Sequence, residues 1–215
     1  MVCMLGPNGC GKSTLLRTLA GLQPALSGEY THSDAKNIAL VLTERLSMDN
    51  TTVHDVVALG RYPYSSFLDG LKKEDEIIIE ESLRQVGFSP APSGEGREGA
   101  STFFNAHSDG EKQRILIAKA LAQQTPIILL DEPTAHLDLP HRILILRLLR
   151  QLAHEQGKTI LISTHELDLA LALSDRILLM TPGKGIQLDT ATNLKKTNAF
   201  TSAFSMDIFH PLGEE

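Results

Sequence analysis

The sequence predicts an α/β fold with a mainly parallel sheet and helices on both of its faces. Short apolar runs of strand length recur without polar alternation, as expected for strands that are buried on both sides. From residue 126 onward such runs alternate with helical patterns, which is typical of parallel β-α-β units. The length of 215 residues suits one domain that carries a smaller inserted subdomain.

The individual elements follow from apolar runs and from start and stop signals. Strands are expected at residues 1–5, 37–43, 126–131, 159–164 and 176–181. Helices are expected at residues 13–22, 53–59, 72–86, 111–123, 141–156 and 166–174, with a helical tail from residue 191. Residues 89–106 are rich in Pro, Gly and Ser and predict a loop. We therefore expect a core made of residues 1–45 and 110–215, with an inserted helical subdomain at 46–109.

Composition narrows the possible functions. The formal net charge of −6 and the pI of about 5.7 argue against a nucleic-acid partner, which usually requires a basic face. No apolar run approaches the roughly 18 residues of a membrane span, so a role at a membrane would require a partner. Cys3 and Cys10 are expected to be reduced thiols in a cytosolic protein, and the start of the chain does not resemble a signal peptide.

The strongest motif is GPNGCGKS, which matches the phosphate-binding pattern G-x-x-x-x-G-K-[ST]. It follows an apolar strand and opens a helix, so its amide groups face an anion at the helix start. We expect Lys12 to reach the β- and γ-phosphates of ATP and Ser13 to ligate Mg²⁺. The nucleotide-binding residues expected here are Gly6, Pro7, Asn8, Gly9, Cys10, Gly11, Lys12, Ser13 and Thr14. The fold is then a P-loop NTPase; a Gly-rich turn without a ligand is the alternative.

A second motif, IILLDEP, ends an apolar strand with two carboxylates. The carboxyl ends of parallel strands form the edge at which α/β folds bind ligands. Asp131 is therefore expected to hold Mg²⁺, through water, and Glu132 to act as general base toward the attacking water. Taken alone, this motif is equally compatible with a helix N-cap.

The third motif, HSDGE at residues 107–111, precedes a helical stretch about twenty residues before the two carboxylates. This order resembles the ABC ATPases, whose LSGGQ signature stands at this place. In that family the signature of one protomer closes over the γ-phosphate bound by the other. The resemblance implies a homodimer in which this role falls to Ser108, Asp109, Gly110 and Glu111.

Three further positions resemble motifs of the same family. The sequence AHLD, which ends at Asp138, resembles the D-loop, which contacts the partner protomer. His165 follows the TILIST strand and resembles the switch histidine that senses the γ-phosphate. Glu44, in VLTER, stands at the Q-loop position, where the family has a Gln that contacts Mg²⁺ and the attacking water. We keep Glu44 as an expected catalytic and metal-binding residue.

Two longer segments, VALGRYPY and DEPTAHLDLPHR, resemble importers of iron–siderophore complexes, haem or cobalamin. The resemblance implies a RecA-like core and hydrolysis of MgATP on the cytoplasmic face of the membrane. It also implies a helical subdomain that docks onto a polytopic permease, with an extracytoplasmic binding protein as an indirect partner.

The sequence departs from the family in several places. The family has a longer segment before the P-loop, so we expect a truncated chain that lacks most of the antiparallel subdomain and the aromatic residue that stacks on adenine. Glu44 replaces Gln, and in the signature His107, Asp109 and Glu111 replace Leu, Gly and Gln. Two other interpretations remain: a non-transport ABC ATPase, or a weakly active nucleotide-binding subunit.

Overall fold

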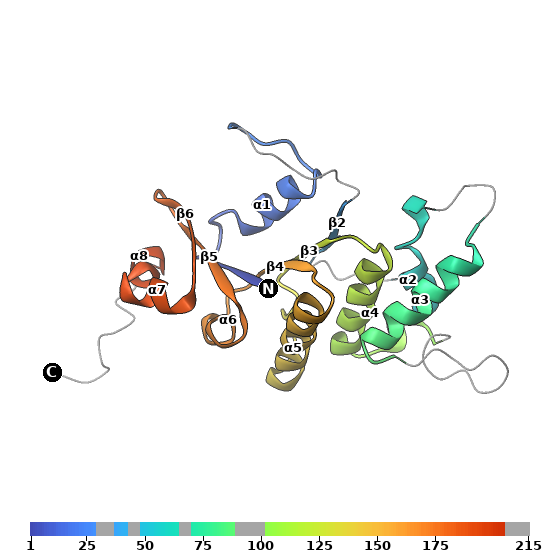
Figure 1. The fold of residues 1–215 in the computed structure, drawn as a ribbon. Coiled ribbons are helices and arrows are strands. Elements are labelled where there is room, and N and C mark those ends of the chain that lie inside the picture. Colours follow the sequence, from blue (N-terminus) through green and yellow to red (C-terminus); the bar gives the residue numbers. More distant parts are fainter. Residues whose placement is uncertain (29–36, 43–47, 65–69, 89–101, 205–215) are drawn as a thin grey trace.

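A mixed six-stranded sheet forms the centre of the molecule (Figure 1). The computed structural model describes residues 1–28, 37–42, 48–64, 70–88 and 102–204. The strands lie in the order β2-β3-β4-β1-β5-β6, and all neighbours are parallel except β6, which is antiparallel to β5. Their bounds are Val2–Leu5 (β1), Ile38–Val41 (β2), Ile127–Asp131 (β3), Thr159–Ser163 (β4), Arg176–Thr181 (β5) and Gly185–Asp189 (β6). The predicted α/β class with a mainly parallel sheet is confirmed.

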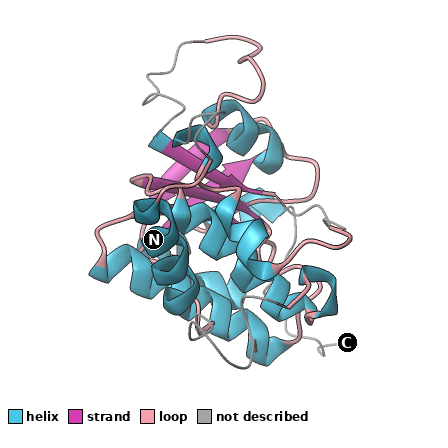
Figure 2. Ribbon diagram, turned by 90° about the vertical axis from the view of Figure 1, so that its right-hand side faces the viewer, coloured by secondary structure: helices cyan, strands magenta, loops and turns pink. Residues whose placement is uncertain are grey.

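The helices lie on both sides of this sheet. Figure 1 shows α1 on one face and α4, α5 and α6 on the other, and Figure 2 shows most helices gathered on one side of the strands. The bounds are Lys12–Leu19 (α1), Val53–Ala58 (α2), Lys73–Gln85 (α3), Asp109–Ala122 (α4), Leu139–Glu155 (α5), Leu167–Leu173 (α6), Ala191–Lys196 (α7) and Ala199–Phe204 (α8). Among the described residues, no helix is both long and apolar enough to span a bilayer.

Strands buried on both faces explain the continuous apolar runs. In β3, Ile128 and Leu130 belong to the large core on the side of α4 and α5, whereas Leu129 joins a smaller cluster under α1. The same alternation holds in β1, where Cys3 and Met4 point to opposite sides. Because both faces are covered at these positions, neither side of the strand carries polar residues.

Helices α2 and α3 pack onto α4 beside the sheet. A buried ion pair supports this packing: Arg61 Nε donates to Asp75 Oδ1 at 2.8 Å, and Arg61 Nη1 donates to the Ala122 carbonyl at 2.9 Å. The amide of Lys72 and the guanidinium of Arg61 hold the pKa of Asp75 below its usual range. The helices of the predicted insert are therefore fastened to the C-terminal end of α4, while the boundary at 46–109 stays a prediction.

The structure differs from the expected elements in two places. Strand β6 was not predicted, because GIQLD is exposed over most of its length and lacks an apolar run. Within the predicted loop at 89–106, Phe103 forms an isolated bridge with Thr52, and a 3-10 helix follows at Phe104–Ala106. Strand β6 forms a tight hairpin with β5, with Thr181 opposite Gly185, whereas the bridge between Thr52 and Phe103 joins distant parts of the chain.

Candidate active site

The GPNGCGKS loop connects the end of β1 to the start of α1. Gly9 and Gly11 have φ angles of 78° and 100°, which glycine adopts without steric cost. Gly11 is the N-cap of α1 and provides no side-chain hydrogen bond to the helix. By contrast, side chains cap the starts of α2, α4, α5 and α7. The first amides of α1 have no intrahelical acceptor and are therefore suited to an anion.

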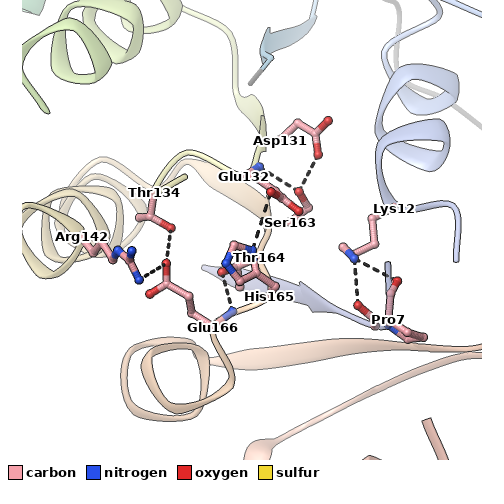
Figure 3. A network of polar contacts seen from close by, with 11 residues as sticks. Pro7, Lys12, Asp131, Glu132, Thr134, Arg142, Ser163, Thr164, His165 and Glu166 are labelled. Carbon is pink, nitrogen blue, oxygen red and sulfur yellow. Dashed lines mark hydrogen bonds and ion pairs between the residues drawn. The ribbon is translucent and has the colours of Figure 1, made fainter. Parts of the chain in front are cut away.

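Lys12 is held inside this loop. Its Nζ donates to the carbonyl oxygens of Gly6 at 2.8 Å and Pro7 at 3.2 Å, as Figure 3 shows. The residue is buried, with 7% of its surface exposed. Among the described residues, the hydrogen-bond acceptors of this buried ammonium are neutral carbonyl oxygens and no carboxylate, so the loop retains an attraction for anions.

Asp131 and Glu132 meet at the carboxyl end of β3, and Ser163 of β4 fixes both. Ser163 Oγ donates to Asp131 Oδ1 at 2.6 Å and accepts from the Glu132 amide at 2.9 Å (Figure 3). The β3–β4 register places Asp131 opposite Ser163, whose surface is fully buried. Glu132 has a left-handed φ of 45°, which is uncommon for a residue with a side chain.

Ser163 is a site residue that the sequence analysis did not single out. It stands in the apolar run TILIS, directly before Thr164 and His165. A serine at the last position of a buried strand, next to a candidate switch histidine, was the available signal. Its hydroxyl orients the aspartate and supports the strained glutamate from the neighbouring strand.

His165 lies beside Glu132, as expected from the end of β4. Its Nδ1 is 3.7 Å from Glu132 Oε2, and 54% of the His165 side chain is exposed, against 29% for Glu132. The two side chains therefore face one another at the surface (Figure 3). A hydrogen-bonding group next to a carboxylate is the arrangement that a water-activating site requires.

The loop and Glu132 line one open pocket of about 430 Å³. Its lining residues are Asn8, Gly9, Gly11, Lys12, Ser13, Thr14 and Glu132. Amides, an ammonium and hydroxyls on one side, with a carboxylate opposite, fit a polyphosphate and its Mg²⁺. No cluster of three or more His, Cys, Asp or Glu that could hold a metal occurs among the described residues.

The residues of the third motif lie at the start of α4 and do not line this pocket. Ser108 caps the helix, and its Oγ donates to Glu111 Oε2 at 2.7 Å. Hydrogen bonds from the hydroxyl and the amide of Ser108 hold the pKa of Glu111 below its usual range. A Cβ on the buried Gly110 would lie 2.7 Å from Cδ2 of His141, so the first turn of α5 packs closely against the first turn of α4.

Asp138 caps α5 and lies in the same region. Its Oδ1 accepts from the His141 amide at 3.2 Å, and the His141 ring also contacts this carboxylate. The His141 side chain is the main cause of a lowered Asp138 pKa. The structure thus brings the expected nucleotide-binding residues into two groups: the loop pocket, and the paired starts of α4 and α5, which carry Ser108, Asp109, Gly110, Glu111 and Asp138.

Comparison with known proteins decides the family. The model of the ABC transporter family matches residues 1–135. The chain belongs to this family. An ABC transporter ATP-binding protein of Methanocaldococcus jannaschii, itself uncharacterized, is 39% identical over 96% of this chain and 72% of its own length. The iron(3+)-hydroxamate import ATP-binding protein FhuC of Bacillus subtilis is 36% identical over 95% of this chain and 77% of its own.

A solved structure agrees with this assignment. A transporter described as a metal-chelate type ABC transporter, in an inward-facing conformation, superposes with a TM-score of 0.84 at 30% identity. The match covers 96% of this chain and 78% of the other. The protein is therefore an ABC-type ATPase, and the pocket at the GPNGCGKS loop is the candidate place of its chemistry.

Two residues at which this ABC ATPase departs from the family pattern are Glu44 and His107. Glu44 lies outside the described residues, so its expected catalytic and metal-binding roles stay predictions. His107 is well packed: its Nε2 lies 2.6 Å from Thr102 Oγ1, and its ring meets Phe88 edge-on at 5.6 Å. Cys3 and Cys10 are free cysteines in the structure, and burial raises the pKa of the Cys3 thiol to about 12; the expectation of reduced thiols in a cytosolic protein stays a prediction.

Proposed function

We propose that this chain is the ATP-hydrolysing motor subunit of an importer for iron–siderophore complexes, haem or cobalamin. The observation that carries the ATPase part is the single pocket lined by Lys12, Ser13 and Glu132. The importer part is supported by two similar proteins, the iron(3+)-hydroxamate import ATP-binding protein FhuC and the metal-chelate type ABC transporter.

The mechanism follows from the side chains at the pocket. Lys12 and the uncapped start of α1 bind the β- and γ-phosphates, with Gly6, Pro7, Asn8, Gly9, Cys10, Gly11 and Thr14 completing the loop. Ser13 and, through water, Asp131 would hold Mg²⁺, and the bound ion would supply positive charge against the phosphates. Glu132 accepts the proton of the attacking water, and His165 interacts with the γ-phosphate. The products are ADP and phosphate.

A second copy of the chain completes each site in this proposal. The residues at the starts of α4 and α5 do not line the pocket of their own protomer, and this placement is consistent with a role at the pocket of a second copy. Ser108, Asp109, Gly110 and Glu111 would face the γ-phosphate bound by the partner, with Asp138 at the interface. Closure on ATP and opening after hydrolysis would then drive the transporter.

The proposed membrane partner is a polytopic permease that docks on the helices between residues 46 and 109. Within the RYPY segment Arg61 is buried, but the two tyrosines are exposed: 58% of Tyr62 and 46% of Tyr64 are accessible. Exposed aromatic side chains are favoured at protein interfaces. The chain would lie on the cytoplasmic face of the membrane through this permease, with an extracytoplasmic binding protein as an indirect partner.

The importer proposal is tested by co-expression with a siderophore-type permease and co-purification in detergent. We expect the wild-type chain to co-purify and Tyr62→Asp to be lost, while ATP binding remains. Ile186→Asp serves as the matched control, because Ile186 is similarly exposed, at 51%, on β6. Stable turnover without any affinity for such permeases would favour the non-transport ATPase. Turnover that is unchanged in Glu132→Gln would exclude the proposed chemistry.

A further inference from the structure

Three side chains next to the pocket form a connected group that the proposed function leaves without a role. Thr134 Oγ1 donates to Glu166 Oε1 at 3.2 Å, and Arg142 Nη1 lies 3.3 Å from the same oxygen. Arg142 Nε also donates to the Leu137 carbonyl at 2.5 Å. We call Thr134, Arg142 and Glu166 the clamp; Figure 3 shows it beside Glu132 and His165.

The clamp joins the two segments that follow the candidate catalytic side chains. Thr134 and Leu137 belong to the segment after Glu132, and Glu166 follows His165 directly. The Glu166 amide donates to Thr164 Oγ1 at 3.1 Å, and the Thr164 amide donates to the Met4 carbonyl of β1 at 3.1 Å. One end of the clamp is therefore anchored to the strand that leads into the GPNGCGKS loop.

The segment after Glu132 needs such support. Its backbone is left-handed at two non-glycine residues, Glu132 with φ 45° and His136 with φ 65°. Two backbone hydrogen bonds stiffen it, from the Ala135 amide to Glu132 and from the Leu137 amide to Thr134. Strained backbone of this kind persists only where surrounding contacts hold it.

We infer that Arg142 and Glu166 are positioning residues that fix Glu132 relative to His165 for hydrolysis. The inference rests on the proposed function, in which Glu132 is the general base. The burial of Glu166 favours a fixed geometry, because only 11% of its side chain is exposed, whereas Arg142 is partly exposed at 34%. The clamp touches neither the loop nor Lys12, so it acts on turnover rather than on ATP binding.

Steady-state kinetics test whether the clamp affects turnover and leaves ATP binding unchanged. In Glu166→Ala and Arg142→Ala, kcat should fall roughly 10- to 100-fold, as expected when a reacting group is misplaced, while KM for MgATP stays within about twofold. Glu166→Gln keeps an acceptor oxygen for both donors, so it should retain most of the activity. Arg147→Ala, an exposed arginine on the same helix, is the matched control and should behave like the wild type.

Hydrogen exchange of the nucleotide-free chain provides a readout that does not need turnover. In both alanine variants the amides of Ala135 and Leu137 should exchange at least about tenfold faster, with the rest of the sheet unchanged. A wild-type protein whose turnover does not depend on Lys12 would refute the proposed function. The hydrogen exchange of Ala135 and Leu137 would still decide whether the clamp holds the segment after Glu132. Unchanged exchange with unchanged kcat, a change in KM alone, or faster exchange throughout the chain would overturn the inference.

Discussion

Ser163→Ala is the substitution that most directly perturbs the geometry of both carboxylates. Ser163 is fully buried, and its hydroxyl is bonded at 2.6 Å to Asp131 Oδ1 and at 2.9 Å to the Glu132 amide. A hydrogen bond to a charged group contributes about 1.5–3 kcal/mol, and an unpaired buried amide costs about 1–3 kcal/mol. We therefore expect the free energy of unfolding to fall by about 2.5–6 kcal/mol.

The same change should slow hydrolysis, because Asp131 and Glu132 lose a common support. Groups that orient metal ligands typically affect activity by about 10- to 100-fold, and we expect kcat to fall within this range. Urea unfolding and steady-state ATPase assays measure the two effects. Ser82→Ala is the matched control: Ser82 is also buried, but its hydroxyl bonds to the Ile78 carbonyl of its own helix, so kcat should not change. A Ser163→Ala protein with wild-type stability and wild-type kcat would refute the reasoning.

Two further predictions concern the packing of the helices onto α4. In Gly60→Ala, the new Cβ would lie 2.3 Å from the Lys119 carbonyl oxygen, so α2 must shift; we expect about 1–3 kcal/mol of destabilisation in urea unfolding, and an unchanged midpoint would contradict this packing. Asp75→Asn leaves Arg61 buried without its anion and should cost about 3 kcal/mol at neutral pH. The pKa of Asp75 is lower in the folded than in the unfolded protein. The Asp75 carboxylate therefore stabilises the fold fully above its unfolded pKa, near 3.9, and this stabilisation is lost as the pH falls through its lower folded pKa. The difference in the free energy of unfolding between the wild type and Asp75→Asn should therefore decrease as the pH is lowered. An increase of this difference in acid would contradict the prediction.

Much of the fold was predictable because its signals are local. The apolar runs of β1, β3, β4 and β5 and the GPNGCGKS motif lie within a few neighbouring residues, and the structure places them as expected. The position of His165 beside Glu132 also followed from the sequence, since both residues stand at the carboxyl ends of parallel strands.

Two of the unpredicted features depend on contacts between separated parts of the chain, whereas the third, β6, is an exposed strand paired with its neighbour in sequence. The role of Ser163 requires the β3–β4 register, which pairs it with Asp131. The clamp likewise requires Arg142 of α5 to reach Glu166 after β4, and a single sequence does not indicate which arginine and which glutamate meet. Strand β6 carries no apolar run because it is exposed, so only its pairing with β5 defines it.

The most direct test of the central claim is a MgATP titration of the purified chain by isothermal calorimetry, beside Lys12→Ala. Lys184→Ala is the control, since Lys184 is an exposed lysine whose Nζ donates to Ser202 Oγ of α8 at 3.4 Å. We predict saturable binding in the wild type and in Lys184→Ala, and its loss in a folded Lys12→Ala protein. Equal binding by wild type and Lys12→Ala, or no binding by a folded wild type, would contradict the assignment of the GPNGCGKS loop as the ATP site.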